Sequence, residues 1–169
     1  MNEILTPRLQ LFPLTMAHLQ LALRGQELLA AALAFPIVAD MAYPAVHRAM
    51  QTKVQKMAQA DMATHAWYTY WLMVLKANPV AIGMIGFKGA PNVHGEVEIG
   101  YGVAPEYERQ GYTTEAAQAL VAWGLAQPTC HAVIAATYKD NVASQRVLQK
   151  IGMTLAQEEE TEFIWRITG

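Results

Sequence analysis

The sequence predicts an α+β domain in which helices flank a central β-sheet, a three-layer α/β arrangement. The first observation is that strand-like and helix-like segments alternate along the chain, without repeats, linkers or low-complexity tracts. The second is size, because 169 residues suit one domain, spanning residues 1–169. The third is composition: 53% hydrophobic against 15% charged residues supplies a sizeable core and is the reverse of the disordered balance.

The first third of the chain predicts one strand followed by helices. Residues 4–12 alternate loosely between apolar and polar side chains, which favours a strand. Thr15 suits the N-cap of a helix over 16–24, and the alanine and leucine content of 27–34 favours a second helix. A longer helix is expected over 44–60, with Pro44 in its first turn and apolar residues at helical spacing: Val46, Met50, Val54 and Met57.

The middle third predicts strands. Residues 67–75 are aromatic and β-branched on both alternating faces, which is typical of a strand covered on both sides. A turn at Asn78-Pro79 separates them from a strand over 80–87. A third strand is expected over 96–104. Its alternation places two carboxylates and two glycines on one face, which is unusual for a core strand: Glu96, Glu98, Gly100 and Gly102.

The last third predicts a helix, a strand, a second helix and a closing hairpin. Residues 113–126 have helical spacing and stop before Pro128, and residues 132–137 form a further strand. Asn141 is a suitable N-cap for a helix that ends at Gly152. Residues 153–159 and 163–167 then pair, which brings the expected sheet to about seven strands.

Charge and composition exclude several classes of partner. The net charge of −2, without a basic run, is not that of a nucleic-acid binder. The longest apolar run, 28–39, contains Pro36 and is too short to span a bilayer, and the first residues lack a signal-peptide pattern. The single cysteine, Cys130, cannot form an internal disulfide, and the five histidines are far apart. We therefore expect a cytoplasmic protein without membrane, nucleic acid or metal.

The stretch 103–115 is the most informative for chemistry. A strand leads into a glycine-containing loop that opens directly into a helix. The free N–H groups of 110–113 and the positive end of the helix dipole would form a cradle for an anion. Gly111 would let a phosphate approach the backbone closely. The alternative is an ordinary strand–turn–helix connection.

In order and spacing, five segments together resemble the GNAT superfamily of acyl-CoA-dependent N-acyltransferases, in particular the branch of the ribosomal-protein N-terminal acetyltransferases. The resemblance covers nearly the whole chain. The segments are Thr6-Pro7-Arg8-Leu9, Gly83-Met84-Ile85-Gly86-Phe87, Glu98-Ile99-Gly100-Tyr101, the loop from Val103-Ala104-Pro105-Glu106-Tyr107 to Gln110-Gly111-Tyr112-Thr113-Thr114-Glu115-Ala116, and Asn141 with Ser144 followed by Lys150-Ile151-Gly152-Met153.

The resemblance implies a mixed, mostly antiparallel sheet whose fourth and fifth strands splay apart to form a cleft. Acetyl-CoA would be the co-substrate, with its pantetheine arm in this cleft against the backbone near Val103. The loop would take the pyrophosphate, and the side-chain amide of Asn141 would bond the arm; helix capping is the alternative role for Asn141. The residues expected at the loop are Arg109, Gln110, Gly111, Tyr112, Thr113 and Thr114.

The resemblance also implies catalytic roles. Glu98 is the candidate base, directly or through a water, because it would lie on the strand beside the thioester, with Glu96 as the substitute. The backbone N–H of Val103 is a candidate donor to the developing oxyanion. Ser144 is the candidate proton donor to the leaving thiolate. A solvated or ion-paired carboxylate is the alternative for Glu98, and a solvated or locally bonded hydroxyl is the alternative for Ser144.

Three residues depart from the pattern of the family. Glu108 stands where many members have arginine or glutamine, and its carboxylate would repel the pyrophosphate unless it points outward. Thr113 stands where glycine or alanine is usual. Leu148 fills the position of a general-acid tyrosine in other branches, although Tyr138 could approach the thiol from the preceding strand.

The acceptor side is expected to be walled by the N-terminal helices and the second strand. An aromatic pocket there would suit a hydrophobic amine or a peptide N-terminus; the alternative is that these residues are core. The candidate acceptor residues are Met41, Tyr43, Trp67 and Trp71, with Phe35 and Tyr70 nearby. We expect direct N-acetyl transfer from acetyl-CoA to a primary amine, in a monomer or homodimer. The alternatives are a catalytically inactive acyl-CoA-binding module or sensor, and a structural domain whose loop binds nothing.

Overall fold

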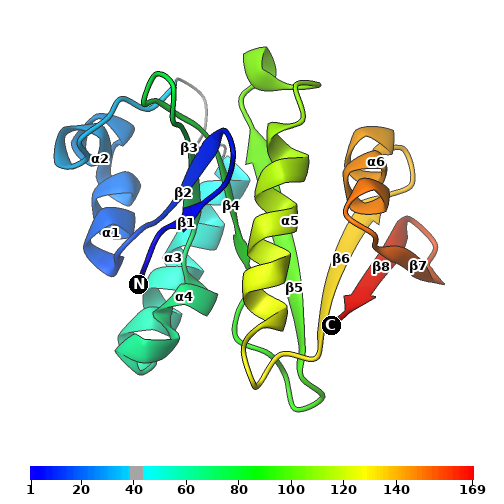
Figure 1. Ribbon diagram of the computed structural model, residues 1–169. Coiled ribbons are helices and arrows are strands. Elements are labelled where there is room, and N and C mark those ends of the chain that lie inside the picture. The colour runs from blue at the N-terminus through cyan, green and yellow to red at the C-terminus, as the bar shows by residue number, and fades with distance from the viewer. Residues whose placement is uncertain (39–43) are drawn as a thin grey trace.

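A computed structural model describes residues 1–38 and 44–169 and contains one eight-stranded sheet, in the order β1-β2-β3-β4-β5-β6-β8-β7 (Figure 1). All neighbouring strands are antiparallel except β5 and β6, which are parallel. The predicted mixed, mostly antiparallel α+β fold is confirmed. The strands are β1 (Ile4–Leu5), β2 (Leu9–Pro13), β3 (Trp71–Leu75), β4 (Ala81–Phe87), β5 (Glu96–Val103), β6 (Ala132–Tyr138), β7 (Thr154–Glu158) and β8 (Glu162–Thr168).

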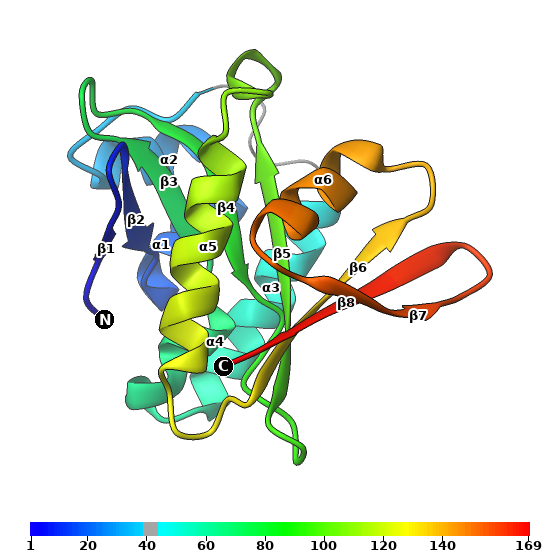
Figure 2. The ribbon, with the colours of Figure 1, turned by 45° about the vertical axis from the view of Figure 1, so that its right-hand side comes forward.

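Helices cover both faces of the sheet (Figure 2). α5 and α6 lie on one face, and the N-terminal helices α1, α2 and α3 lie on the other. Thr15 caps α1 as predicted, because its side chain accepts a hydrogen bond from the His18 N–H. The helices are α1 (Met16–Arg24), α2 (Gln26–Ala32), α3 (Pro44–Gln59), α4 (His65–Tyr68), α5 (Tyr112–Leu125) and α6 (Val142–Lys150), with 3₁₀ turns at Met62–Thr64 and Pro105–Tyr107.

The eighth strand arises because the strand predicted over 4–12 is two strands. Thr6 turns the chain: its backbone N–H donates to the Leu9 carbonyl, and its hydroxyl accepts from the Leu9 N–H at 2.9 Å. β1 and β2 therefore pair with each other as a tight hairpin. Pro7 lies in the turn, where its missing N–H costs nothing to the sheet.

The prediction of a strand over residues 67–75 is wrong at the N-terminal end of that range. Residues 65–68 form the short helix α4, and the strand begins only at Trp71. A helix–turn segment starts upstream, where the Asp61 side chain caps the 3₁₀ turn. Trp67 on α4 then packs its ring against Phe87 and Trp123, with centroids 4.9 and 4.8 Å apart. An apolar run buried on all sides has the same composition in a helix as in a strand, so the pattern could not separate them.

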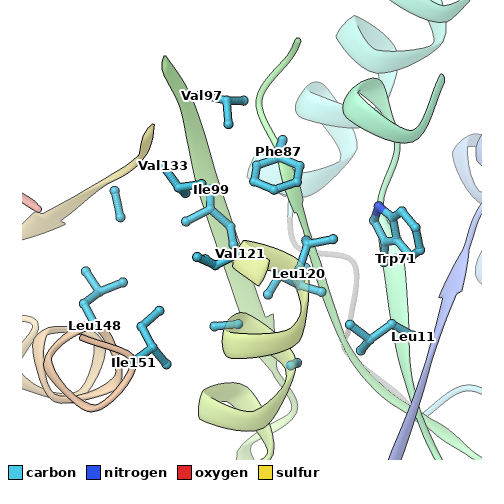
Figure 3. Packing of buried hydrophobic residues seen from close by; sticks show 14 of the residues in the cluster. Leu11, Trp71, Phe87, Val97, Ile99, Leu120, Val121, Val133, Leu148 and Ile151 are labelled. Atoms are coloured by element: carbon cyan, nitrogen blue, oxygen red, sulfur yellow. The ribbon is translucent and has the colours of Figure 1, made fainter. Parts of the chain in front are cut away.

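The core on the α5 face joins the two halves of the sheet (Figure 3). Leu120 and Val121 of α5, Leu148 of α6 and Ile151 directly after α6 are buried against strand residues. Trp71 is 1% exposed and lies in the same cluster. In the described part of the chain, no helix is both long and apolar enough to cross a membrane.

The sheet divides after a short contact between β5 and β6. The two strands pair only through three residue pairs, with Glu96, Val97 and Glu98 opposite Ala132, Val133 and Ile134. Beyond these pairs β6 follows β8 and diverges from β5, as Figure 2 shows. The splayed strands predicted as the fourth and fifth of the family are thus β5 and β6 of this chain.

Candidate functional site

Two cavities border the C-terminal end of β5. A polar cavity of about 940 Å³ lies between the loop that precedes α5 and the first turns of α6. An apolar pocket of about 470 Å³ lies between α3 and strands β4 and β5. Tyr101, Gly102 and Val103 line both. These three residues therefore form the border between the two cavities.

The backbone of Val103 faces the gap between β5 and β6. The Ala104 N–H donates to the Ile82 carbonyl at 2.8 Å, which fixes the register of β5 against β4. Because hydrogen-bonded and non-hydrogen-bonded pairs alternate in antiparallel sheets, the polar groups of Tyr101 and Val103 point away from β4. β6 has left that side, so these groups are available to a ligand in the splay.

The loop before α5 presents a row of backbone donors. The N–H groups of residues 109–114 have no hydrogen-bond partner among the described residues. Gly111 is the N-cap of α5 with φ of 82°, a left-handed conformation that favours glycine, and no side chain caps this helix. Arg109 is also left-handed, with φ of 60°. Successive N–H groups at a helix N-terminus form a site for an anion.

The position of this loop is fixed by Arg8, 102 residues earlier than Gln110. The Arg8 guanidinium donates to the Gln110 carbonyl at 2.9 Å and to the Glu115 carboxylate at 2.7 Å. It also lies 4.5 Å from the centre of the Tyr112 ring. Burial raises the pKa of Glu115, but hydrogen bonds from Thr6 and Arg8 and the charge of Arg8 outweigh it and lower the pKa. The β1–β2 hairpin thus holds the start of α5.

The predicted loop residues line the polar cavity, with one exception. Gln110 does not contribute to its lining, because its side chain donates to the Glu106 carbonyl at 2.9 Å. Two cations that the sequence reasoning did not identify also line the cavity: Arg146 and Lys150 of α6. Arg146 and Lys150 have the spacing of one helical face together with Ala143 and Val147. The helical periodicity of residues 141–152 could therefore have placed both cations on the same face of this helix. The predicted members of the lining are Val103, Arg109, Gly111, Tyr112, Thr113, Thr114, Asn141 and Ser144.

Ser144 and Tyr101 form a hydrogen-bonded pair at the junction of the cavities. The two hydroxyl oxygens lie 2.9 Å apart. Asn141 positions this turn, since its side-chain oxygen accepts from the Ser144 N–H at 3.1 Å as the N-cap of α6. Burial raises the pKa of Tyr101, and the hydrogen bond with Ser144 offsets part of the rise. Tyr101 therefore stays protonated at neutral pH and can donate a proton. Its place in the strand signature was noted from the sequence, but no role was assigned to it.

Both candidate bases are ion-paired. Glu98 contacts Lys88, which lines the apolar pocket. Glu96 pairs with Arg166 of β8 at 3.0 Å. Glu96 and Glu98 both lie on the same face of β5 as Gly100, which lines the pocket, and both belong to the stretch that pairs with β6. Glu98 is the one next to Gly100 on that face, and its partner Lys88 lines the pocket, whereas the partner of Glu96 lies on β8. The geometry therefore favours Glu98 over Glu96 for any role in the pocket.

The structure corrects the expected acceptor wall. Trp67 and Trp71 are buried core residues on the α5 face, and neither belongs to the lining of the apolar pocket in the described part of the chain. Met41 and Tyr43 lie outside the described residues. Tyr70 does line the pocket, beside cationic residues that the sequence reasoning did not identify: Lys53, Lys56 and Lys88.

The three residues that depart from the family pattern lie in different parts of the structure. Glu108 and Thr113 line the polar cavity, whereas Leu148 is fully buried in the core. Tyr138, considered as a replacement for the missing tyrosine, is 62% exposed at the end of β6. The hydroxyl at the junction belongs instead to Tyr101.

Comparison with known proteins identifies the fold family. The family model described as an acetyltransferase (GNAT) domain matches residues 8–154. The chain belongs to this family. The GNAT domain is also 39% identical over 85 residues to the uncharacterized N-acetyltransferase YjdG of Bacillus subtilis, a match that covers 50% of this chain and 51% of that protein. The match thus spans about half the length of this curated relative.

Solved structures share the whole GNAT fold at lower identity. The ribosomal-protein-S5-alanine acetyltransferase from Vibrio fischeri has a TM-score of 0.71 at 14% identity, covering 99% of this chain and 97% of that chain. RimL, a ribosomal L7/L12 alpha-N-protein acetyltransferase in complex with coenzyme A, has a TM-score of 0.66 at 16% identity, with coverage of 99% and 98%. These likenesses support the fold, which is the expected one.

Proposed function

We propose that this GNAT domain is an N-acetyltransferase that moves an acetyl group from acetyl-CoA to a primary amine by direct attack in a ternary complex. The observation that carries the proposal is the meeting of the two cavities at Tyr101, Gly102 and Val103. A thioester that enters from the polar side reaches an amine that enters from the apolar side at this point. Family membership supports the same reaction class.

The donor would bind in the polar cavity. The unpaired N–H groups of residues 109–114 and the dipole of α5 would hold the pyrophosphate, with Arg109, Arg146 and Lys150 adding positive charge. The exposed polar groups of Tyr101 and Val103 would bond the amides of the pantetheine arm in the manner of an added strand. The complex of RimL with coenzyme A is consistent with a donor in this fold.

The acceptor amine would be neutral when it attacks the thioester carbon. A C–N bond forms and the C–S bond breaks, so the amine nitrogen loses a proton and the thiolate gains one. Glu98 is the proposed base, through a water, because it lies on the pocket face of β5. The Val103 N–H, directed into the splay, is the proposed donor to the carbonyl oxygen.

Tyr101 and Ser144 would return the proton to the thiolate. Their hydroxyls share one hydrogen bond at the junction, so either can donate while the other stabilises the resulting anion. This pair replaces the tyrosine that other branches carry at the position of Leu148. The proposal extends the predicted role of Ser144 to a two-residue unit.

Binding and transfer can be tested separately. Acetyl-CoA at about 100 times its dissociation constant should stabilise the fold by about 2.7 kcal/mol, which a thermal-shift assay detects. Transfer predicts release of free thiol with at least one amine from a panel of amino acids, peptides and polyamines. Stabilisation without thiol release would indicate a CoA-binding module, and no stabilisation would exclude both functions.

The proton-return pair makes a sharper prediction. Tyr101→Phe should lower kcat by about tenfold to a hundredfold with little change in acetyl-CoA affinity, because general-acid groups contribute at least that much. Ser144→Ala and the double variant complete a cycle, in which non-additive effects identify a coupled pair. If Tyr101→Phe had the same kcat as the wild type, the Tyr101–Ser144 pair would have no part in the mechanism. If Glu98→Gln had the same kcat as the wild type, Glu98 would not be the base.

A further inference from the structure

The apolar pocket has a strongly cationic wall. Three lysines belong to its lining: Lys53, Lys56 and Lys88. In the part of the chain that the structure describes, no aspartate or glutamate contributes to that lining. The carboxylate of Glu98, which is outside the lining, is paired with Lys88. The rest of the wall is apolar or aromatic, with Val46, Ala49, Tyr70, Met84 and Phe87.

Lys53 is the unusual member of this group, because it is only 6% exposed. Its ammonium donates to the carbonyls of Thr69 and Phe87 and lies 4.5 Å from the centre of the Tyr70 ring. An ammonium has three donors, and these two carbonyls account for two of them. No described carboxylate pairs with Lys53, while the charge of Lys56 acts on it from the next turn of α3. A buried charge without a counter-charge is costly unless a ligand supplies one.

We infer that the acceptor amine carries a carboxylate, which lies against Lys53 and Lys56 while the amine points to the junction at Gly102. This inference rests on the proposed function. It narrows the acceptor to free amino acids with an apolar side chain, rather than peptide N-termini. The apolar wall takes the side chain of the acceptor. The carboxylate supplies the counter-charge that Lys53 and Lys56 lack among the described residues.

The cations of the apolar pocket and those of the donor cavity come from different elements. One side of α3 lines the pocket opposite β4 and β5. It carries, at helical spacing, Val46, Ala49, Lys53 and Lys56. The cations of the donor cavity come from the loop and α6 instead. Each anionic end of the ternary complex therefore has its own set of cations, on opposite sides of β5.

A free amino acid and its amide differ only in the carboxylate, so they test the inference directly. Acetyl transfer is measured for leucine against leucinamide, and for phenylalanine and methionine against their amides. We expect the wild type to favour the acids. Lys56→Gln should reduce the acid-to-amide ratio of kcat/KM by about fivefold, the worth of a well-placed exposed ion pair. Lys53→Met should reduce it by at least about tenfold, since bonds to charged groups are stronger.

The ratio between variants cancels the different amine pKa values of acids and amides. Arg48→Gln is the matched control, because Arg48 lies on the same helix, carries the same charge and is exposed outside the pocket lining. Lys56 is exposed, so Lys56→Gln keeps the test valid even if Lys53→Met fails to fold. An unchanged ratio in Lys56→Gln, or a wild-type preference for the amides at equal concentrations of neutral amine, would overturn the inference and indicate peptide N-termini.

A binding measurement separates this inference from the proposed function. 4-Methylpentanoate is leucine without its amine, so it can occupy the pocket but cannot react. It should raise the melting temperature of the wild type and of Arg48→Gln equally, and that of Lys56→Gln by less. Stabilisation of this kind without any thiol release would support the carboxylate site while contradicting transfer. Thiol release with amines but no stabilisation by 4-methylpentanoate would support transfer and contradict the carboxylate site.

Discussion

At the residue scale, Lys53 connects the stability of the protein with its proposed substrate site. Burial, together with the smaller effect of the Lys56 charge, lowers the pKa of Lys53 from its usual 10.5 to about 7. The two carbonyls and the Tyr70 ring hold the ammonium in place. A methionine would fill the same space without charge, so this position retains lysine at a cost to the fold.

This cost predicts a pH dependence of stability. Between pH 7 and 10.5 the unfolded chain holds a proton on Lys53 that the folded chain has released. The free energy of unfolding should therefore rise with pH across this window, by at most about 1.4 kcal/mol per pH unit. Urea unfolding at pH 7.5, 8.5 and 9.5 measures the difference between wild type and Lys53→Met, in which shared contributions from Cys130 and the tyrosines cancel. If the difference in free energy of unfolding between wild type and Lys53→Met did not change with pH, the lowered pKa of Lys53 would be contradicted.

At the element scale, the β1–β2 hairpin positions the loop before α5. Arg8→Ala removes the bonds to Gln110 and Glu115 and the contact with Tyr112. We expect the dissociation constant of acetyl-CoA to rise by about fivefold to thirtyfold, equivalent to about 1–2 kcal/mol. Calorimetric titration measures it, with Arg24→Ala, at the C-terminal end of α1, as the control. Affinity equal to that of the wild type would mean that the loop holds its shape without the hairpin.

The glycines of β5 keep the junction open, which gives a second prediction at this scale. A Cβ built on Gly100 or Gly102 would meet no atom within 4 Å. Gly100→Val should therefore fold with a melting temperature within a few degrees of wild type, because valine is favoured in strands. It should retain the acetyl-CoA thermal shift and lose acetyl transfer, since Gly100 lines only the apolar pocket.

Gly102→Val is the matched variant, because Gly102 lines both cavities. It should weaken acetyl-CoA binding as well as transfer. The two variants together separate the donor side from the acceptor side of β5. Normal transfer by Gly100→Val would show that the acceptor reaches the thioester by another route.

At the scale of the whole molecule, patterns local in sequence were sufficient for most of the fold. The alternation of residues 96–104 placed Glu98 and Gly100 on one face, and the loop sequence placed the proposed donor site at the start of α5, where the structure has a polar cavity. Contacts across the sheet were not accessible in this way. Arg8 and Glu115 are separated by 107 positions, and nothing in either segment indicates the other.

Lys53 shows a second limit of sequence reasoning. Lysine is almost never fully buried, so composition and periodicity place it in solvent. Its burial depends on carbonyls at the ends of other elements, those of Thr69 and Phe87. Trp67 shows a third limit, since the sequence placed it in a strand and among the candidate acceptor residues, whereas it is buried in the core on the short helix α4. Properties that depend on partners distant in sequence therefore required the structure.

The division of the sheet predicts where acetyl-CoA stabilises the molecule. β6, β8, β7 and α6 join the rest of the sheet through the three residue pairs of β5 with β6 and through core contacts with α5. A ligand between the loop and α6 would add contacts across this division. Amide hydrogen exchange measured by mass spectrometry should therefore slow most at residues 109–114 and 141–146 when acetyl-CoA is added. Residues 16–32, in α1 and α2, serve as the internal control and should exchange at the same rate with and without acetyl-CoA. Slower exchange at the loop without slower exchange at α6 would mean that acetyl-CoA binds one half of the sheet only, and Asn141 and Ser144 would then have no part in holding it.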